Sequence, residues 1–268
     1  MFFWNELTTR DFAALDASQT IAILPIAATE QHGPHLPVAT DSAIAAGMLA
    51  LLRRRLPADL PVLVLPIQEI GKSNEHILSP GTLTQSAEQL IEGWCAIGAG
   101  VRRTGLRKLV IVNSHGGNAP VMDIVARELR IREQMLVAAT QWNRFGLPPD
   151  LFDERERRHG LHGGAVETSL MLHFRPDLVR RSELRNFVSA AAGMEERFTH
   201  LRPVVPHGIG WIIQDLNPDG ALGDAAKASA EAGARVAEHQ VAGFMALLRD
   251  VQRFDPASLA RMDREARA

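Results

Sequence analysis

The stretch "IAILPIAATEQHGPHLPVATDSAIAAGMLALLRRRL", residues 21–56, contains the structural unit that the rest of the chain repeats. Its first eight residues are apolar and partly β-branched, which is typical of a strand buried on both faces. Residues 41–56 have the small and apolar composition of a helix. The polar loop between them contains Gly33, Pro34 and Pro37, which disfavour a helix there. A strand, a loop and a helix in this order form one β–α unit.

The β–α pattern recurs along the chain. Further strands are predicted at 61–68, 108–114 and 134–142, and further helices at 84–105, 118–133 and 223–251. Repeated β–α units imply a largely parallel sheet with helices on both faces. Asn118 is a plausible N-cap for its helix. The charged run "DERERR" at 153–158 is predicted to be a solvated loop.

Composition narrows the class of protein. The 268 residues suffice for one large domain or two small ones, and a net charge of −2 gives no sign of a basic surface for nucleic acid. No apolar run is long enough to span a bilayer, and the N-terminal residues do not resemble a secretory signal. Cys95 is the single cysteine, so no disulfide can form within the chain. We therefore expect a cytoplasmic protein.

Reactive side chains follow the predicted strands. Glu30 and His32 come after the first strand, and His115 follows the third within "NSHGGN". A further segment, "HGGAVETS", supplies His162 and Glu167. In an open α/β sheet, ligands bind beyond the carboxyl ends of the strands. We therefore expect these segments to converge on one edge of the sheet.

These side chains, together with Asp41, offer metal ligands. Two imidazoles and three carboxylates are nitrogen and oxygen donors that suit zinc, manganese or iron. Crowded carboxylates raise one another's pKa unless cations intervene. Two divalent ions, bridged by one carboxylate, would compensate the charge, activate a water and polarise a carbonyl.

Less specific explanations exist for single residues. A lone histidine after a strand is more often a structural hydrogen-bonding group. Gly33 and Pro34 prevent His32 and His35 from forming a helical zinc pair, so we expect only one of the two to be a ligand. Glu167 could instead be an acid that favours a helix N-terminus.

Five motifs together point to a known family. They are "LPIAATEQHGPHLPVATD", "GKSNEHILSPGTLT", "VNSHGGN", "HGGAVETSLM" and "DLNPDGALGDAAKASAEAG". In this order, over nearly the whole chain, the sequence resembles the creatininase family of amidohydrolases. The resemblance implies a three-layer α/β/α sandwich with a mostly parallel central sheet, one hydrolase domain over residues 1–268, and a homohexamer.

The resemblance also implies roles for individual residues. Asp41 corresponds to a ligand that bridges two divalent ions, and Glu167 completes the site in members with two glycines after the motif histidine. His162 corresponds to the histidine that shuttles a proton to the leaving group. The implied metal ligands are Glu30, His32, Asp41, His115 and Glu167.

Departures from creatininase itself concern the substrate. Trp142 matches a tryptophan that packs over creatinine, but Arg158 replaces a second one. Gly116 and Gly117 stand where creatininase has bulky and acidic residues. We expect a wider, more polar opening that disfavours creatinine and suits a larger, anionic compound. The predicted pocket lining is Ser73, Glu75, His76, Trp142 and Arg158.

The sequence thus predicts a dinuclear metal hydrolase that cleaves the amide C–N bond of a small, cyclic or polar molecule. The alternatives within the family are hydrolysis of a C–C bond in a cyclic ketone of the inosose type and cleavage of a peptide in a cofactor precursor. A non-enzymatic metal or nucleotide-binding module is disfavoured, because no G-x-G-x-x-G follows the first strand. No nucleic-acid or membrane partner is expected.

Overall fold

The computed structural model describes residues 2–204 and 206–260. Its centre is a sheet of four parallel strands, in the order β2–β1–β3–β4. Ile23 pairs with Val64 on one side and with Val110 on the other. This arrangement confirms the predicted parallel sheet. The strands are β1 (Ile21–Ile26), β2 (Val62–Val64), β3 (Lys108–Asn113) and β4 (Leu136–Gln141).

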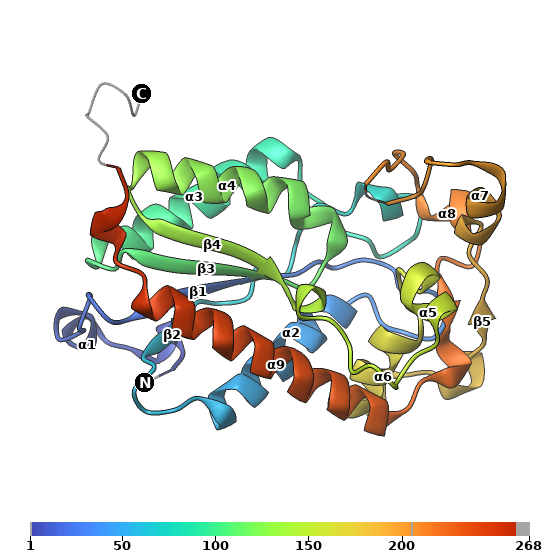
Figure 1. The fold of residues 1–268 in the computed structure, drawn as a ribbon, viewed down its shortest axis with the longest axis horizontal. Helices are drawn as coiled ribbons and strands as arrows, with labels where there is room; N and C mark the ends of the chain where they lie inside the picture. Colours follow the sequence, from blue (N-terminus) through green and yellow to red (C-terminus); the bar gives the residue numbers. More distant parts are fainter. Residues whose placement is uncertain (1, 205, 261–268) are drawn as a thin grey trace.

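Helices cover both faces of this sheet (Figure 1). On one face lie α3 (Ala87–Arg103) and α4 (Ala119–Arg132). On the other lie α2 (Thr40–Arg55) and α9 (Ala230–Arg253), and α6 (Ala165–Phe174) packs against both. Side chains of β1 alternate between the two cores, with Ile23 on the α2–α9 side and Leu24 on the α3–α4 side. The three-layer α/β/α sandwich is therefore confirmed.

Shorter elements gather beyond the carboxyl ends of the strands, where Figure 1 shows α5, α7, α8 and β5. The strands β5 and β6 form a second, two-stranded antiparallel sheet. Among the described residues, no helix combines the length and the apolar character needed to cross a bilayer. The remaining elements are α1 (Thr9–Ala13), α5 (Glu154–His159), α7 (Ala191–Arg197), α8 (Ile213–Leu216), β5 (Asn186–Phe187) and β6 (Gly223–Asp224).

The prediction of a loop at 153–158 is wrong, because this charged run forms α5. Asp153 caps the helix by accepting a hydrogen bond from the backbone N–H of Glu156. Glu156 itself is buried, and its carboxylate accepts hydrogen bonds from the backbone N–H groups of Ala165 and Asp224 at 2.6 and 2.7 Å. A carboxylate that looks solvated in the sequence thus anchors the segment that precedes α6.

One helix start and one helix cap also differ from expectation. The helix predicted from 223 begins at Ala230, because Gly223 and Asp224 pair with β5 and Ser229 caps α9. Asn118 does occupy the N-cap position of α4, but its side chain does not cap the helix. Its amide instead donates to the carbonyl of Ala27 and accepts from the backbone N–H of Lys72.

Candidate metal centre

The loop after β1 folds back on itself and brings three predicted ligands together. The backbone N–H of Glu30 donates to the carbonyl of Val38, which closes the loop just before α2. Gly33 has a positive φ of 71°, a conformation that glycine adopts at little cost. As a result, Glu30 and His32 face Asp41, the second residue of α2.

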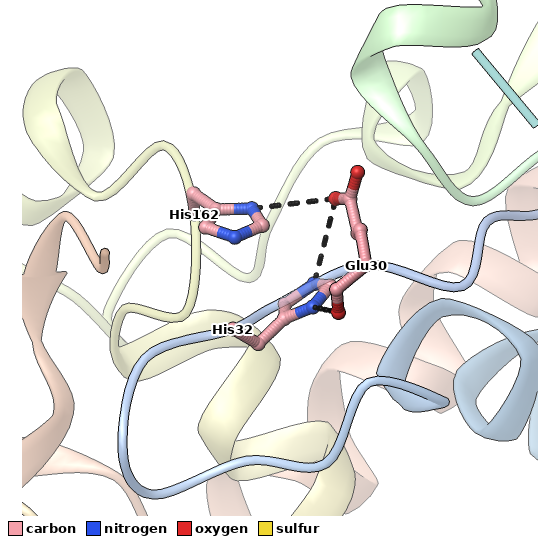
Figure 2. A group of neighbouring side chains, drawn as sticks. All are labelled: Glu30, His32 and His162. Carbon is pink, nitrogen blue, oxygen red and sulfur yellow. Dashed lines mark hydrogen bonds and ion pairs between the residues drawn. The ribbon is translucent and has the colours of Figure 1, made fainter. Parts of the chain in front are cut away.

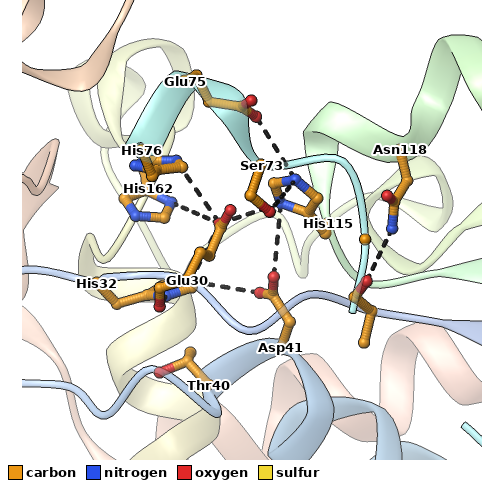
Figure 3. Close-up of polar contacts among 12 residues, drawn as sticks. Glu30, His32, Thr40, Asp41, Ser73, Glu75, His76, His115, Asn118 and His162 are labelled. Atoms are coloured by element: carbon orange, nitrogen blue, oxygen red, sulfur yellow. Dashed lines mark hydrogen bonds and ion pairs between the residues drawn. The ribbon is translucent and has the colours of Figure 1, made fainter. Parts of the chain in front are cut away.

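His115 and Glu167 complete this group from other elements. Figure 3 shows His115 beside Glu30 and Asp41. His115 follows β3, and its backbone N–H donates to the side chain of Asn113. Glu167 lies in the first turn of α6, with its Oε2 3.9 Å from His32 Nε2. The five predicted ligands therefore converge on one edge of the sheet. Four of them are buried, and Glu167 is partly buried, with its side chain 27% exposed.

Asp41 joins two groups of ligand atoms. Its Oδ1 lies 3.3 Å from His32 Nε2, and its Oδ2 lies 3.5 Å from His115 Nδ1. Glu30 Oε1 lies 3.0 Å from the same His115 nitrogen, and Glu167 Oε2 lies 3.9 Å from His32 Nε2. Four groups of three ligand atoms among the described residues could hold an ion, and two of these triads share Asp41: Glu30–Asp41–His115 and His32–Asp41–Glu167. The other two groups, Glu30–His32–His162 and Glu30–Glu75–His76, share Glu30 instead.

These separations fit metal coordination. Two ligands about 2.1 Å from a tetrahedral ion lie about 3.4 Å from each other. Three distances lie within 0.4 Å of that value: Asp41 Oδ1 to His32, Asp41 Oδ2 to His115, and Glu30 Oε1 to His115. The two distances at Asp41 are longer than most direct hydrogen bonds. The distance of 3.9 Å between Glu167 and His32 is about 0.5 Å longer than that value. The two oxygens of Asp41 face different triads, as a bridging carboxylate requires.

Unpartnered polar atoms support the same assignment. Both carboxylate oxygens of Glu30, Asp41 Oδ2 and His32 Nε2 are buried without a hydrogen-bond partner. Such atoms are costly in a folded protein unless a cation, a proton or water satisfies them. The residues present therefore fit a pair of divalent ions.

A backbone carbonyl fixes the orientation of each proposed ligand imidazole, on the side of the ring that faces away from the triads. His32 Nδ1 lies 3.0 Å from the carbonyl of Glu30, and His115 Nε2 lies 2.8 Å from the carbonyl of Lys72. A carbonyl can only accept, so these nitrogens carry the hydrogen in the neutral rings. The other nitrogen of each ring then presents a lone pair to the carboxylates, the usual arrangement of a metal-binding histidine.

In the absence of metal ions, protons on the histidines and on some carboxylates compensate the negative charge of the site. Burial opposes charge on His115 and His32, but the carboxylates around them outweigh it and raise the pKa of His115 to about 10 and that of His32 to about 9. Burial and the neighbouring carboxylates raise the pKa of Glu167 to about 7, and burial also raises the pKa of Asp41. The site therefore holds positive charge tightly, as protons or as metal ions.

His162 stands over this group without completing either triad. Its Nε2 donates to the carbonyl of Gln31 at 2.7 Å, and its Nδ1 lies 3.7 Å from Glu30 Oε1 (Figure 2). The ring packs beside His32, with centroids 4.1 Å apart. Burial and the neighbouring His32 hold the pKa of His162 well below its usual range, so its ring is neutral near pH 7. A neutral imidazole with a free Nδ1 can accept a proton.

Three residues of the predicted pocket lining, which come from the 73–76 segment, lie beside the centre (Figure 3). His76 is buried, and its Nε2 lies 3.6 Å from Glu30 Oε1. Glu75 Oε1 lies 3.5 Å from His115 Nε2, and Ser73 Oγ lies 3.3 Å from that same nitrogen. Ser73 and Glu75 thus contact the side of His115 that faces away from the triads.

The other two predicted lining residues lie apart from this cluster. Trp142 is buried in the α2–α9 core, where its ring meets Phe244 edge to face with centroids 4.9 Å apart. Arg158 is exposed on α5, and its guanidinium pairs with Glu154 at 2.8 Å and with Glu195 at 3.6 Å. Neither side chain has a described contact with the triads.

The two glycines after His115 differ from each other. A side chain at Gly116 would meet open space, whereas a Cβ at Gly117 would lie 2.2 Å from the carbonyl of Lys72 and 2.3 Å from Glu75 Oε1. The opening predicted from both glycines therefore exists only at Gly116.

Sequence reasoning missed two buried polar residues. Gln31 lies between two ligands, yet nothing in its sequence context sets it apart from a solvated amide. Glu156 lies within a charged run and is hidden for the same reason. His35 Nε2 contacts the Gly163 carbonyl and Thr168 Oγ1 and not the triads, and the expectation that only one histidine of its pair is a ligand stays a prediction.

Comparison with known proteins decides the family. The family model described as creatininase, creatinine amidohydrolase, matches residues 5–248. The chain belongs to the creatininase family. A relative in Mycolicibacterium smegmatis, named mycofactocin precursor peptide peptidase, is 30% identical over 243 residues, covering 90% of this chain and 89% of the relative. The creatinine amidohydrolase of Pseudomonas putida is 31% identical over 195 residues, covering 66% and 73%.

Further creatininase-family relatives extend the comparison. The 3-dehydro-scyllo-inosose hydrolase of Thermotoga maritima is 26% identical over 252 residues, covering 88% of this chain and 79% of the relative. Among solved structures, a creatininase mutant of the Zn–Zn type superposes with a TM-score of 0.75 at 26% identity, covering 94% and 98%. A structure titled creatininase Mn superposes with a TM-score of 0.72 at 25% identity, covering 94% and 99%.

Proposed function

We propose that this creatininase-family hydrolase holds two divalent ions per chain and cleaves an amide C–N bond. The observation that carries the proposal is the placement of Asp41, whose two buried oxygens face two separate histidines at 3.3 and 3.5 Å. A purely structural carboxylate would be expected to accept hydrogen bonds, but Asp41 Oδ2 has none.

The two triads define the proposed ion sites, with Asp41 shared between them. Zinc, manganese and iron all suit such donors, and related structures are titled with zinc and with manganese. When bound, such a pair of ions activates a water and polarises a carbonyl. Glu167 is the third member of the second triad, 3.9 Å from His32 Nε2. Its Oε2 also accepts a hydrogen bond from the backbone N–H of Gly163 at 2.5 Å, just before α6, so Glu167→Gln has to separate the proposed ligand role from a role at the helix N-terminus.

His162 is the proposed proton shuttle. Its Nε2–H is held by the Gln31 carbonyl, so Nδ1 is the nitrogen that can take a proton and pass it to the departing nitrogen of the amide. The ring is buried among His32, His76 and Glu30, so its orientation is well defined. Such a positioned group contributes about 10²–10⁴-fold to a rate.

The proposed substrate is an amide other than creatinine. Relatives over nine-tenths of the chain are named as peptidases of a peptide precursor, so a peptide amide is the first compound to test. Substrate contacts by Ser73, Glu75, Trp142 and Arg158 stay predictions. The guanidinium of Arg158 already pairs with Glu154 and Glu195. The structure therefore supports an anionic substrate less than the sequence does.

The test is a steady-state assay of the zinc-loaded and manganese-loaded protein with creatinine, cyclic amides, formamides and short peptides. We expect hydrolysis of an amide in this panel and poor turnover of creatinine. A kcat/KM for creatinine of about 10⁴ M⁻¹s⁻¹ or above would contradict the substrate proposal. Loss of activity on chelation, with recovery on metal addition, tests the metal requirement.

A second candidate is hydrolysis of a C–C bond in a cyclic ketone, which the name of the Thermotoga relative favours. Product analysis separates the two candidates, because only C–N cleavage releases an amine. We further propose a homohexamer of single-domain chains located in the cytoplasm. The apolar side chains of Ile77, Leu78 and Leu83 are each more than half exposed and would suit an interface between copies.

A further inference from the structure

Gln31 contacts two stacked histidines in opposite ways. Its backbone carbonyl accepts from His162 Nε2 at 2.7 Å, whereas its side-chain amide nitrogen lies 2.8 Å from His76 Nδ1. The rings of His76 and His162 stack with centroids 4.2 Å apart. One residue therefore meets one ring with an acceptor and the other ring with a donor.

The orientation of the Gln31 amide is fixed by two backbone groups. Its Oε1 accepts from the N–H of Gly33 at 2.9 Å, and its Nε2 donates to the carbonyl of Gly220 at 2.8 Å. A flipped amide would place oxygen against a carbonyl and nitrogen against an N–H, losing both bonds. The Nε2 atom has two hydrogens, which the Gly220 carbonyl and His76 Nδ1 use. Its contact with His162 Nε2 is longer, at 3.4 Å.

The two histidines consequently differ in which nitrogen carries the hydrogen. His76 accepts at Nδ1, so its neutral ring carries the hydrogen on Nε2, 3.6 Å from Glu30 Oε1. His162 donates at Nε2, so its free lone pair is on Nδ1, 3.7 Å from that same oxygen. A donor and an acceptor thereby both face Glu30 Oε1, at distances too long for a hydrogen bond, so neither is used by that carboxylate (Figure 3).

We propose that His76 donates its Nε2–H to the substrate oxygen that becomes negative during hydrolysis, and that Gln31 is the positioning residue that fixes this tautomer. The inference rests on the proposed function for the identity of that oxygen. His76 is distinguished from the metal-binding histidines, because His32 and His115 each meet a carbonyl behind the ring. A ring held by an amide donor, as His76 is, presents a hydrogen and not a lone pair to the site.

The tautomer is tested by ¹⁵N NMR of the metal-loaded protein labelled at histidine, with His76 assigned from the spectrum of His76→Phe. We expect a protonated Nε2 and an unprotonated Nδ1 at His76. In Gln31→Glu, the carboxylate can only accept, so the hydrogen moves to Nδ1. A wild-type His76 protonated on Nδ1 overturns the proposal, whatever the enzyme is found to hydrolyse.

The donor role is tested with inorganic phosphate, a tetrahedral oxyanion, by calorimetry on zinc-loaded protein. A hydrogen bond to a charged group is worth about 1.5–3 kcal/mol, so His76→Phe should raise the phosphate Kd by roughly 10- to 100-fold. Gln31→Met, which keeps length but lacks the donor, should raise it in the same direction. Gln68→Met is the matched control, since the Gln68 amide donates to Pro66 away from the centre.

The outcomes separate this inference from the proposed function. Unchanged phosphate affinity in His76→Phe, or no binding to the zinc-loaded wild type, contradicts the donor role. If zinc content and the His76 tautomer are as expected but no amide is hydrolysed, the proposed function fails while the positioning role of Gln31 stands. Retained zinc in His76→Phe shows that the lost phosphate affinity does not come from a lost ion.

Discussion

Asp41→Asn tests the bridging carboxylate, because the amide keeps the shape of the side chain and removes its charge. In the wild type, both ion sites use an oxygen of this residue. A ligand present at about 1,000 times its Kd stabilises a protein by about 4 kcal/mol per site, hence about 8 kcal/mol for two independent sites. At roughly 2–4 °C per kcal/mol, zinc should raise the Tm of the wild type by roughly 15–30 °C.

The loss expected in Asp41→Asn follows from the same numbers. Removing a residue that hydrogen-bonds to a metal ligand lowers metal affinity by about 10- to 100-fold. Removing a direct ligand should lower it by at least about 100-fold. A 100-fold loss is about 2.7 kcal/mol, so two sites lose at least about 5.5 of the 8 kcal/mol. The zinc-dependent rise in Tm should then fall below about 10 °C.

The assay is thermal unfolding of each protein with and without zinc, so that any effect of the substitution on the metal-free fold cancels. Asp123→Asn is the control, because Asp123 is an exposed acid on α4. A zinc-dependent rise in Asp41→Asn equal to that of the wild type would refute the bridge. A loss confined to one site would show that Asp41 binds a single ion.

Three further predictions concern single groups. Glu167→Gln should weaken one of two ions and severely reduce activity, as measured by elemental analysis beside the assay, whereas a helix-capping role predicts intact activity and a loss of about 0.3–1 kcal/mol. His162→Ala should keep both ions but lose roughly 10²–10⁴-fold in rate, and a collapse of metal content would make it a ligand instead. In the metal-free protein, the raised pKa values of His115, about 10, and His32, about 9, mean that both bind protons at pH 7. Metal binding should therefore release protons and weaken as the pH falls from 9 to 7, and calorimetry in two buffers should detect that release.

Much of the sheet and its ligands could be predicted from the sequence. Residues 21–28 and 109–112 are continuous apolar runs flanked by polar residues, so the positions of these two strands are visible in the sequence. Because parallel strands end at a common edge, the residues after them had to meet, which places Glu30 near His115 without any knowledge of side-chain packing.

The rest depends on tertiary contacts that leave no local pattern. Glu156 lies in a run of charges, and only the backbone N–H groups of Ala165 and Asp224 make its burial favourable. Gln31 looks like a surface amide until Gly220 and His76 are brought to it from distant segments. Trp142 lies at the predicted strand end, but the direction of its ring depends on Phe244 in α9.

A crystal structure of the zinc-loaded or manganese-loaded protein, with the ions located by anomalous scattering, tests the dinuclear centre most directly. We expect two anomalous peaks per chain, one contacting Glu30, Asp41 and His115 and the other contacting His32, Asp41 and Glu167. A single peak, or two peaks that do not share Asp41, would contradict the dinuclear centre.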